Sequence, residues 1–234
     1  MYEERAALVP GVIVWTRRSG DGDGGAVGGS DYRVLPDGCM DLIWHDGALL
    51  VAGPDTVAHL SADRPGSAYA GLRFAPGAGP RALGAPAREL RDQRVPLDAL
   101  WPARAARALA DRAGGGDPAA VLEEWAVRRT HETGPADPLS AGVAAGLRAG
   151  RPLSAVAAGA GLGERQLRRR CEAAFGYGPK TLARVLRMQR ALALARRGTA
   201  FAEVALRAGY ADQAHLAREV KALAGVPLGR LLRP

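Results

Sequence analysis

Two sets of side chains in the C-terminal part of the chain have the chemistry needed to read base edges. Arg165, Arg168 and Arg169 share one face of a predicted helix. Further along, a second predicted helix presents Gln213, Ala214, His215 and Arg218. Arginine can donate two hydrogen bonds to guanine O6 and N7, and glutamine can pair likewise with adenine. We therefore predict that these residues face the bases of a nucleic acid.

The segments carrying these sets repeat one another. The run LSAVAAGAGLGERQLRRRCEAAFGYGP at 153–179 compares with FAEVALRAGYADQAHLAREVKALAGVP at 201–227. In each, a short alanine-rich helix must end at a glycine, Gly161 or Gly209, because glycine adopts the left-handed conformation at little cost. A second helix then begins, at Glu164 in the first copy and after the N-cap Asp212 in the second. The repeat predicts two helix-turn-helix units, at about 153–175 and 201–223.

Each second helix also carries an apolar stripe opposite its polar face. The stripe residues are Leu167, Cys171, Ala174 and Phe175 in the first copy and Leu216, Val220 and Leu223 in the second. A recognition helix needs this build, because one face is buried while the other enters a major groove. The alternative, that a basic helix is merely a solvated surface, explains one such helix better than a repeated pair.

A long helix is predicted from Pro179 to Arg197 between the two copies. Such a helix can hold two recognition helices about 34 Å apart, one duplex turn. The cations along and beside it are expected to contact phosphates rather than bases: Lys180, Arg184, Arg187, Arg196 and Arg197.

The positive charge is confined to this part of the chain. Residues 139–234 hold 17 Lys and Arg against 5 Asp and Glu, whereas residues 1–138 hold 15 against 19. A compact basic module is suited to a polyanion. Double-stranded DNA is the expected partner; a nonspecific DNA-coating protein needs the same charge but no oriented pair of helices. The chain has no apolar run long enough for a membrane span, so a cytoplasmic protein is expected.

The first half has a different pattern. Short apolar or alternating runs at 12–16, 32–36, 39–45, 48–53 and 68–74 predict strands within about residues 1–75, with a glycine-rich loop at 20–30. Helical spacing begins near Pro80 and covers 88–92, 97–113 and 118–129. The expected fold is α+β: a β-rich, barrel or cupin-like domain with helices at 1–134, then an all-α DNA-binding domain at 135–234.

The N-terminal half also offers a candidate sensor. If 39–45 is a strand, Cys39, Asp41 and His45 share one face and Trp44 lies on the other. A metal site or a reactive Cys39 thiolate that senses alkylation or redox state is one reading, and ordinary packing is the competing one. A ligand pocket is the more general hypothesis, with these candidate lining residues: Trp15, Cys39, Trp44, His45, Tyr69 and Phe74. Dimerisation is the other role expected of this half.

The C-terminal residues resemble the AraC/XylS family of transcription regulators. The resemblance rests on AGLGERQLRRR, FGYGPKTLARVLRMQRALALA and EVALRAGYADQAHLAREVKALAGV, and spans nearly all of 139–234. It implies a seven-helix DNA-binding domain and assigns base contacts to the two polar faces named above. The segments YRVLPDGCMDLIWHDG and GLRFAPGAGPRALGAPARELRDQRVPLDALW resemble an uncharacterised N-terminal domain found in such regulators.

The resemblance implies a transcription regulator that acts on promoter DNA, with RNA polymerase as an expected partner; activation is the expected mode, and repression stays open. A small-molecule effector and a homodimer fit the same expectation. No cofactor, no metal and no enzymatic activity are expected, because the sequence lacks a nucleophile elbow, a phosphate-binding glycine loop before lysine and a His-Glu-x-x-His motif. A Cys39-based alkyl-transfer sensor is the alternative.

Overall fold

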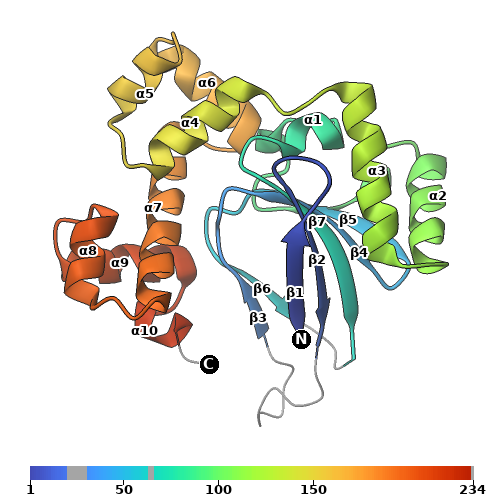
Figure 1. The fold of residues 1–234 in the computed structure, drawn as a ribbon, viewed down its shortest axis with the longest axis horizontal. Helices are drawn as coiled ribbons and strands as arrows, with labels where there is room; N and C mark the ends of the chain where they lie inside the picture. The colour runs from blue at the N-terminus through green and yellow to red at the C-terminus, as the bar shows by residue number, and fades with distance from the viewer. Residues whose placement is uncertain (20–30, 63–65, 233–234) are drawn as a thin grey trace.

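The computed structural model describes residues 1–19, 31–62 and 66–232. Strands and helices make up the N-terminal half, and helices alone make up the C-terminal half (Figure 1). The fold is therefore α+β with an all-α second part, as the sequence predicted. The glycine-rich loop predicted at 20–30 lies outside the described residues.

Eight strands make two sheets in the described part of the chain. The larger has the order β1-β2-β7-β4-β5-β8, and β3 pairs separately with β6; every one of these pairs is antiparallel. The strands are β1 (Tyr2–Ala6), β2 (Val12–Arg18), β3 (Asp31–Val34), β4 (Met40–His45), β5 (Ala48–Ala52), β6 (His59–Ala62), β7 (Ala68–Phe74) and β8 (Arg94–Pro96). The first half is thus the β-rich domain that the sequence predicted, built in the described ranges from two antiparallel sheets.

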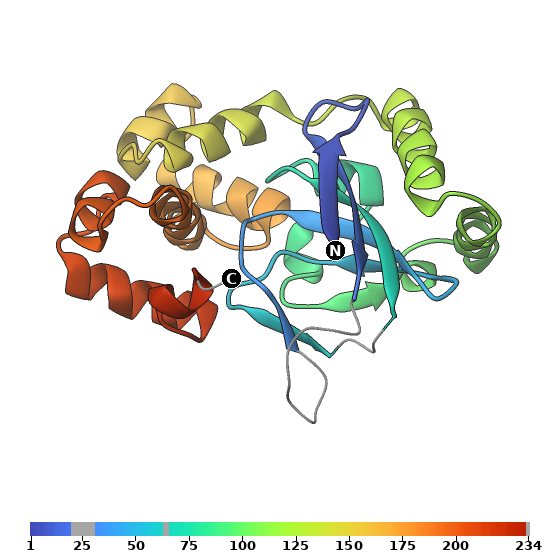
Figure 2. The same cartoon turned by 60° about the horizontal axis from the view of Figure 1, so that its bottom comes forward.

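Alternating residues give the large sheet two unlike faces. Val14, Leu72, Leu42 and Val51 stand opposite one another across β2, β7, β4 and β5, and all four are buried. Helices α2 (Ala103–Gly114) and α3 (Pro118–Thr133) cover this apolar face (Figure 2). The other face carries polar residues and turns toward β3 and β6.

Two predicted helices are shorter than the apolar spacing suggested. The segment predicted at 88–92 is a 3₁₀ turn, η1 (Ala87–Glu89), and the chain then bends at Asp92, whose φ is 58°. The segment predicted at 97–113 is broken into η2 (Leu97–Ala99) and α2, because Pro102 cannot donate a helical hydrogen bond and disfavours a helical residue before it. A short helix, α1 (Gly79–Leu83), precedes both.

Seven helices form the described C-terminal half, the number that the family resemblance implied. They are α4 (Pro138–Arg148), α5 (Leu153–Gly159), α6 (Glu164–Phe175), α7 (Pro179–Arg196), α8 (Phe201–Ala208), α9 (Gln213–Ala224) and α10 (Leu228–Leu231). Leu182 and Leu186 of α7 pack with α4–α6, whereas Met188 and Leu192 pack with α8–α10. The long helix therefore belongs to both cores and joins the two units.

Candidate nucleic-acid interface and adjoining cavity

The polar face of α6 is exposed along its length. Arg165, Arg168 and Arg169 are exposed, while Leu167 and Phe175 on the opposite side are buried. The helix begins after Gly163, whose backbone N–H is bonded by the Gln166 side chain at 3.1 Å. The predicted base-facing arginines thus stand on one solvent-exposed face of a well-packed helix.

One of these arginines has an intrahelical partner. Arg168 Nε donates to Glu172 Oε1 at 2.9 Å, and the Arg168 side chain is still 73% exposed. Exposed i,i+4 pairs contribute only about 0.3–0.5 kcal/mol, so a base or phosphate can displace Glu172. Arg165 and Arg169 form no ion pair with any residue that the structure describes.

The polar face of α9 begins at a side-chain cap. Asp212 accepts a hydrogen bond from the His215 backbone N–H at 2.6 Å. Gln213, Ala214 and Arg218 are exposed. The half-buried His215 ring instead turns inward, where Nδ1 accepts from the Ala211 N–H at 3.3 Å and Nε2 lies 3.2 Å from Glu219 Oε2. His215 therefore supports the turn as well as bordering the polar face.

Helices α6 and α9 can be compared position by position, because each has twelve residues and ends at a left-handed glycine. Arg169 and Arg218 occupy the same sixth position, and both are exposed. Arg165 corresponds to Ala214. At the seventh position, exposed Arg170 corresponds to buried Glu219. The exposed polar faces of α6 and α9 are thus equivalent in placement but not in charge.

Buried Glu219 clamps α9 to α7. It accepts hydrogen bonds from Arg184 Nε at 2.9 Å and Arg187 Nη2 at 2.8 Å. The Arg187 guanidinium also lies over the Tyr210 ring, 4.6 Å from its centroid. Burial alone would raise the pKa of Glu219, but the hydrogen bonds from Arg187 and Arg184 lower it below its usual value. The carboxylate therefore stays charged within the interface.

This clamp changes the interpretation of two predicted phosphate contacts. Arg187 is 30% exposed and engaged by both Glu219 and Tyr210, so it would have to leave these partners to contact a phosphate, and its phosphate role stays a prediction. Arg184 is also bound to Glu219, although its side chain is 47% exposed. The other three, Lys180, Arg196 and Arg197, are exposed at the two ends of α7. The role of Glu219 was not predicted from the sequence. The available signal was a glutamate next to Leu216 and Val220, which belong to the apolar stripe of the helix.

A cavity of about 170 Å³ lies between the polar face of the large sheet and the β3–β6 pair. Of the residues predicted for a pocket, Trp15, Cys39 and Tyr69 line it. Trp44 and Phe74 lie on the opposite face against the apolar core, because neighbouring strand residues alternate. His45 stacks on Tyr69 at 4.0 Å but is outside the lining.

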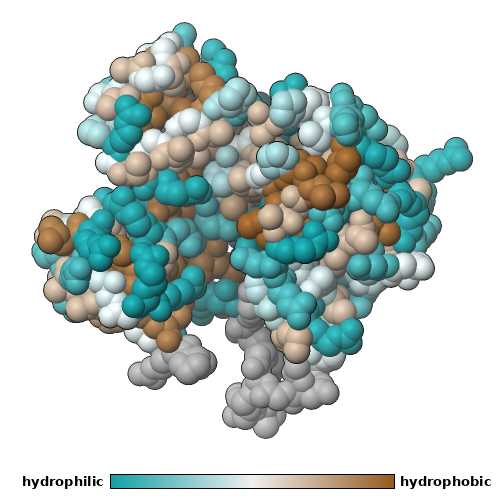
Figure 3. Space-filling view, viewed as in Figure 1, coloured by the Kyte–Doolittle hydropathy of each residue, from teal (hydrophilic) through white to brown (hydrophobic). Residues whose placement is uncertain are grey.

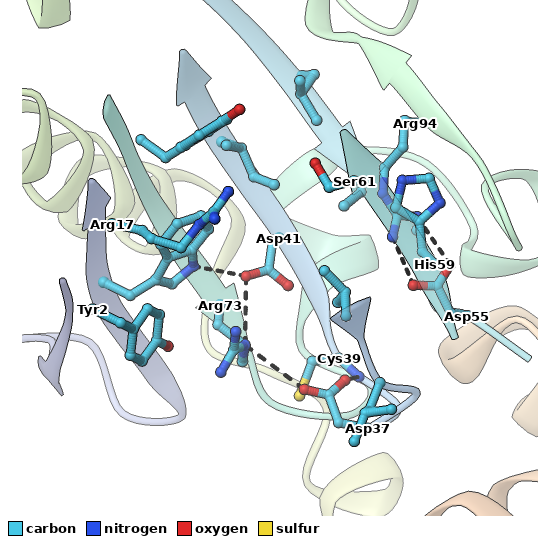
Figure 4. A pocket seen from close by; sticks show the side chains of 18 residues that line it. Tyr2, Arg17, Asp37, Cys39, Asp41, Asp55, His59, Ser61, Arg73 and Arg94 are labelled. Carbon is cyan, nitrogen blue, oxygen red and sulfur yellow. Dashed lines mark hydrogen bonds and ion pairs between the residues drawn. The ribbon is translucent and has the colours of Figure 1, made fainter. Parts of the chain in front are cut away.

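Charged groups on the cavity wall are paired with one another. Figure 4 shows Asp41 between Arg17 and Arg73, with Asp55, His59 and Arg94 on the other side. Arg94 makes two hydrogen bonds to Asp55, at 2.9 and 2.7 Å. Asp55, Arg73 and Arg94 could not be predicted from the sequence, because their pairing joins segments that are distant in the chain.

Asp41 is the most perturbed carboxyl group of this wall. Trp15 Nε1 donates to its Oδ1 at 2.7 Å, and Arg73 Nε is 3.5 Å away. Burial nevertheless raises the pKa of Asp41 to about 6, against the opposing effect of Arg73. Gly71 makes room for this arrangement, because a Cβ there would lie 2.5 Å from the Trp15 ring. The carboxyl group can therefore change charge near neutral pH.

Cys39 has the wrong environment for a nucleophile. Burial, followed by the nearby Asp37 and Asp41, raises the pKa of its thiol well above its ordinary value. The thiolate is the reactive form of cysteine, so an alkylation or redox sensor at Cys39 is disfavoured. The described residues include no cluster of three His, Cys, Asp or Glu side chains able to hold a metal ion.

The β3–β6 pair lies between this cavity and the second helix-turn-helix unit. Val34, His59 and Ser61 line the cavity. On the other side, the Ala58 N–H donates to Leu223 O at 2.7 Å and Arg33 Nη1 donates to Ala224 O at 2.9 Å, both at the end of α9. Gln189 of α7 donates to Pro36 O at 2.6 Å. We call residues 31–37 and 58–62 the arm.

Comparison with known domains agrees with this geometry. Residues 156–233 match a helix-turn-helix domain, and residues 13–96 match a domain of unknown function, DUF6597. No curated protein matches the chain. None of the helices that the structure describes is long and apolar enough to cross a membrane.

Solved structures provide further, more distant similarities. A probable AraC family transcriptional regulator from Rhodopseudomonas palustris CGA009 is 25% identical, with 42% of this chain and 100% of that chain covered and a TM-score of 0.36. ToxT from Vibrio cholerae O395 is 8% identical over 95% of this chain and 97% of that one, with a TM-score of 0.49. Unsaturated fatty acid bound wild-type ToxT from strain SCE256 is 11% identical over 99% and 97%, with a TM-score of 0.47.

The two exposed polar faces, on α6 and α9, both lie within the part of the chain that matches a helix-turn-helix domain. The C-terminal half is thus similar to a helix-turn-helix domain, and most of the strand-bearing N-terminal half is similar to the DUF6597 domain.

Proposed function

We propose that the protein binds specific promoter sequences in double-stranded DNA through α6 and α9. The observation that carries this proposal is the matched placement of Arg169 and Arg218 on two exposed helix faces joined by one helix, α7, whose apolar side is buried in both cores. A nonspecific DNA-binding protein needs positive charge but no such pair. Contact with RNA polymerase, activation and homodimerisation stay predictions from the sequence.

Competition binding tests sequence specificity. Duplexes selected by the full-length protein from random DNA should compete at least about 10³-fold better than unselected duplex at the same salt concentration. The double variant Arg169→Ala/Arg218→Ala should lose most of this preference while still binding DNA through its other cations. A ratio near one for the unmodified protein would overturn the proposal.

We further propose that a small molecule in the cavity modulates DNA binding through the arm. A cavity of about 150 Å³ holds one benzene molecule, so 170 Å³ suits a ligand of single-ring size. The arm supports this coupling, because its residues line the cavity and also bond to the end of α9. A ligand that displaces the arm therefore acts directly on the second recognition helix.

Filling the cavity tests the modulation. Single-ring compounds that raise the unfolding midpoint of the protein should also change its affinity for selected DNA. Ala52 is buried and lines the cavity, so Ala52→Leu should abolish both effects, whereas Ala193→Leu on the exposed side of α7 should leave them intact. Effects that persist in Ala52→Leu would place the ligand elsewhere.

A further inference from the structure

A groove runs along the first recognition helix, and both halves of the protein form its walls. Its volume is about 1180 Å³. Helices α6 and α7 contribute Arg165, Arg168, Arg169 and Lys180, and the N-terminal half contributes Thr56 and Arg91. Five cationic side chains and two carboxylates, Glu164 and Glu172, line it. The excess positive charge suits an anionic partner along the whole groove, including its N-terminal wall.

Close backbone packing fixes the position of this wall relative to α6. Gly176, at the end of α6, has a φ of 80°, and a Cβ there would lie 2.6 Å from Pro54 Cγ and 3.1 Å from Ala87 O. Neighbouring Tyr177 is buried, at 3% exposure. The η1 turn therefore packs directly against the end of the recognition helix, and the residues that follow η1 stay beside the groove.

The turn that carries Arg91 is held by its neighbour Asp92. The Asp92 N–H donates to Pro54 O at 3.2 Å, and its carboxylate accepts from the Thr56 N–H at 2.6 Å and from Thr56 Oγ1 at 2.9 Å. Arg91 Nε is 3.9 Å from Asp92 Oδ2, and the Arg91 side chain is 52% exposed. Thr56 thus makes the short hydrogen bonds to Asp92, and among the residues that the structure describes the Arg91 guanidinium has one long ion pair.

We infer that Arg91 contacts the DNA backbone next to the first recognition helix, so that the N-terminal half supplies part of the DNA-binding surface. This inference rests on the proposed function. A guanidinium matches the geometry of a phosphate and can form two hydrogen bonds with it. Contacts with phosphates set the orientation of a protein on the duplex without reading its sequence. Arg91 therefore acts as an anchor that orients the N-terminal half on bound DNA.

The same segments separate this groove from the cavity. Asp55 and Arg94 point into the cavity, whereas Thr56 and Arg91 face the groove. The Gly53 N–H donates to Gln93 O at 3.0 Å, which joins the two segments through their backbones. One side of these two hydrogen-bonded segments, 53–56 and 91–94, therefore forms part of the cavity wall, and the other side forms part of the groove wall.

Full-length Arg91→Ala, Arg91→Lys and Arg107→Ala test the inference by binding to selected and random duplexes across a salt series. Arg107 is exposed on α2, at the end of the molecule remote from α6 (Figures 1 and 2), and serves as the matched control. Arg91→Ala should weaken binding to both duplexes by the same factor and reduce the salt slope by about one. Arg91→Lys should restore much of the loss, and Arg107→Ala should bind like the unmodified protein.

Two outcomes would overturn the inference. Unchanged affinity in Arg91→Ala would remove the contact, and tighter binding would show instead that this wall obstructs α6. Either result can occur while the unmodified protein still prefers selected DNA, which leaves the proposed function standing. Conversely, equal binding of selected and random duplexes would sink the proposed function, while a uniform loss in Arg91→Ala would still uphold the phosphate contact. Unfolding midpoints check that each variant is folded.

Discussion

The two helix-turn-helix units present their exposed polar faces alike but are held in place differently. Both second helices have twelve residues, and Arg169 and Arg218 lie at the same position. The end of α6 packs closely against the N-terminal half. A Cβ at Gly77 would lie 2.8 Å from Phe175 Cε1, and a Cβ at Gly176 would lie 2.6 Å from Pro54 Cγ. Helix α9 is held by the ionic clamp of Glu219 and by the arm.

The comparison shows that two helices can present equivalent polar faces while different contacts hold each helix to the rest of the protein. Apolar packing at α6 does not depend on pH, whereas the carboxylate clamp at α9 does. The surface of the second unit also differs from that of the N-terminal half. Hydrophilic side chains cover much of the side formed by α7–α9 (Figure 3). An apolar patch lies over the turn between β1 and β2, where Leu8 is 80% exposed (Figure 3). Breaking each attachment should therefore affect one unit more than the other.

The largest effect is expected at Phe175. Its side chain is 2% exposed within the core of the first unit, and truncating a buried phenylalanine costs about 3–5 kcal/mol. Phe175→Ala should lower the stability of the protein by this amount in denaturant unfolding. Phe201→Ala, at the half-buried start of α8, is the control and should cost less. Equal losses of stability in the two variants would show that Phe175 contributes no more to the core than Phe201.

The next largest effect concerns the clamp. Glu219→Ala leaves Arg184 and Arg187 without their buried partner, and we expect a loss of about 2 kcal/mol, because both guanidiniums remain partly solvated. Glu203→Ala removes an exposed i,i+4 pair with Arg207 at 3.2 Å and should cost no more than about 0.5 kcal/mol. Urea unfolding of the two variants measures the contrast, and similar losses would exclude a clamp.

The clamp should also give the second unit an acid dependence. The folded pKa of Glu219 lies below its ordinary value of 4.5, so its stabilisation is fully present above pH 4.5 and is lost as pH falls through the folded pKa. The stability difference between the unmodified protein and Glu219→Gln should shrink over that acidic range. A constant difference would contradict the lowered pKa.

A smaller effect is expected at the helix starts. Asp212 caps α9 with its side chain, whereas Gly163 has no side chain with which to cap α6. Asp212→Ala should therefore cost about 1 kcal/mol, whereas Gly163→Asp should gain only about 0.3 kcal/mol, because glycine is itself an acceptable N-cap. Thermal unfolding measures both changes. A neutral Asp212→Ala would show that the 2.6 Å bond to His215 contributes nothing.

Local pattern predicted much of this structure. Gly161 and Gly209 both have positive φ at the turns of the two units, as the repeat required. Strand alternation in 39–45 correctly separated Cys39 and Asp41 from Trp44. By contrast, β1 was missed, because YEERA is a fully exposed edge strand without apolar alternation.

Contacts between distant segments account for the rest. Arg187 looked like a phosphate contact because nothing near it in the sequence shows that Glu219 of another helix would bind it. Arg91 carries no local signal at all, since its place in the wall of the groove that Arg165 also lines depends on packing of η1 against the end of α6. The pairing of Asp55 with Arg94 is likewise a property of the folded chain.

Base-by-base mapping of binding for Arg169→Ala and Arg218→Ala tests the central claim most directly. Each variant should lose about 1–3 kcal/mol on the selected site and relax the preference at its own base pair. Because α6 and α9 are expected to enter successive major grooves, the two relaxed positions should lie about 10 base pairs apart. Relaxation at one shared position, or an even loss across all sequences, would contradict two equivalent reading helices.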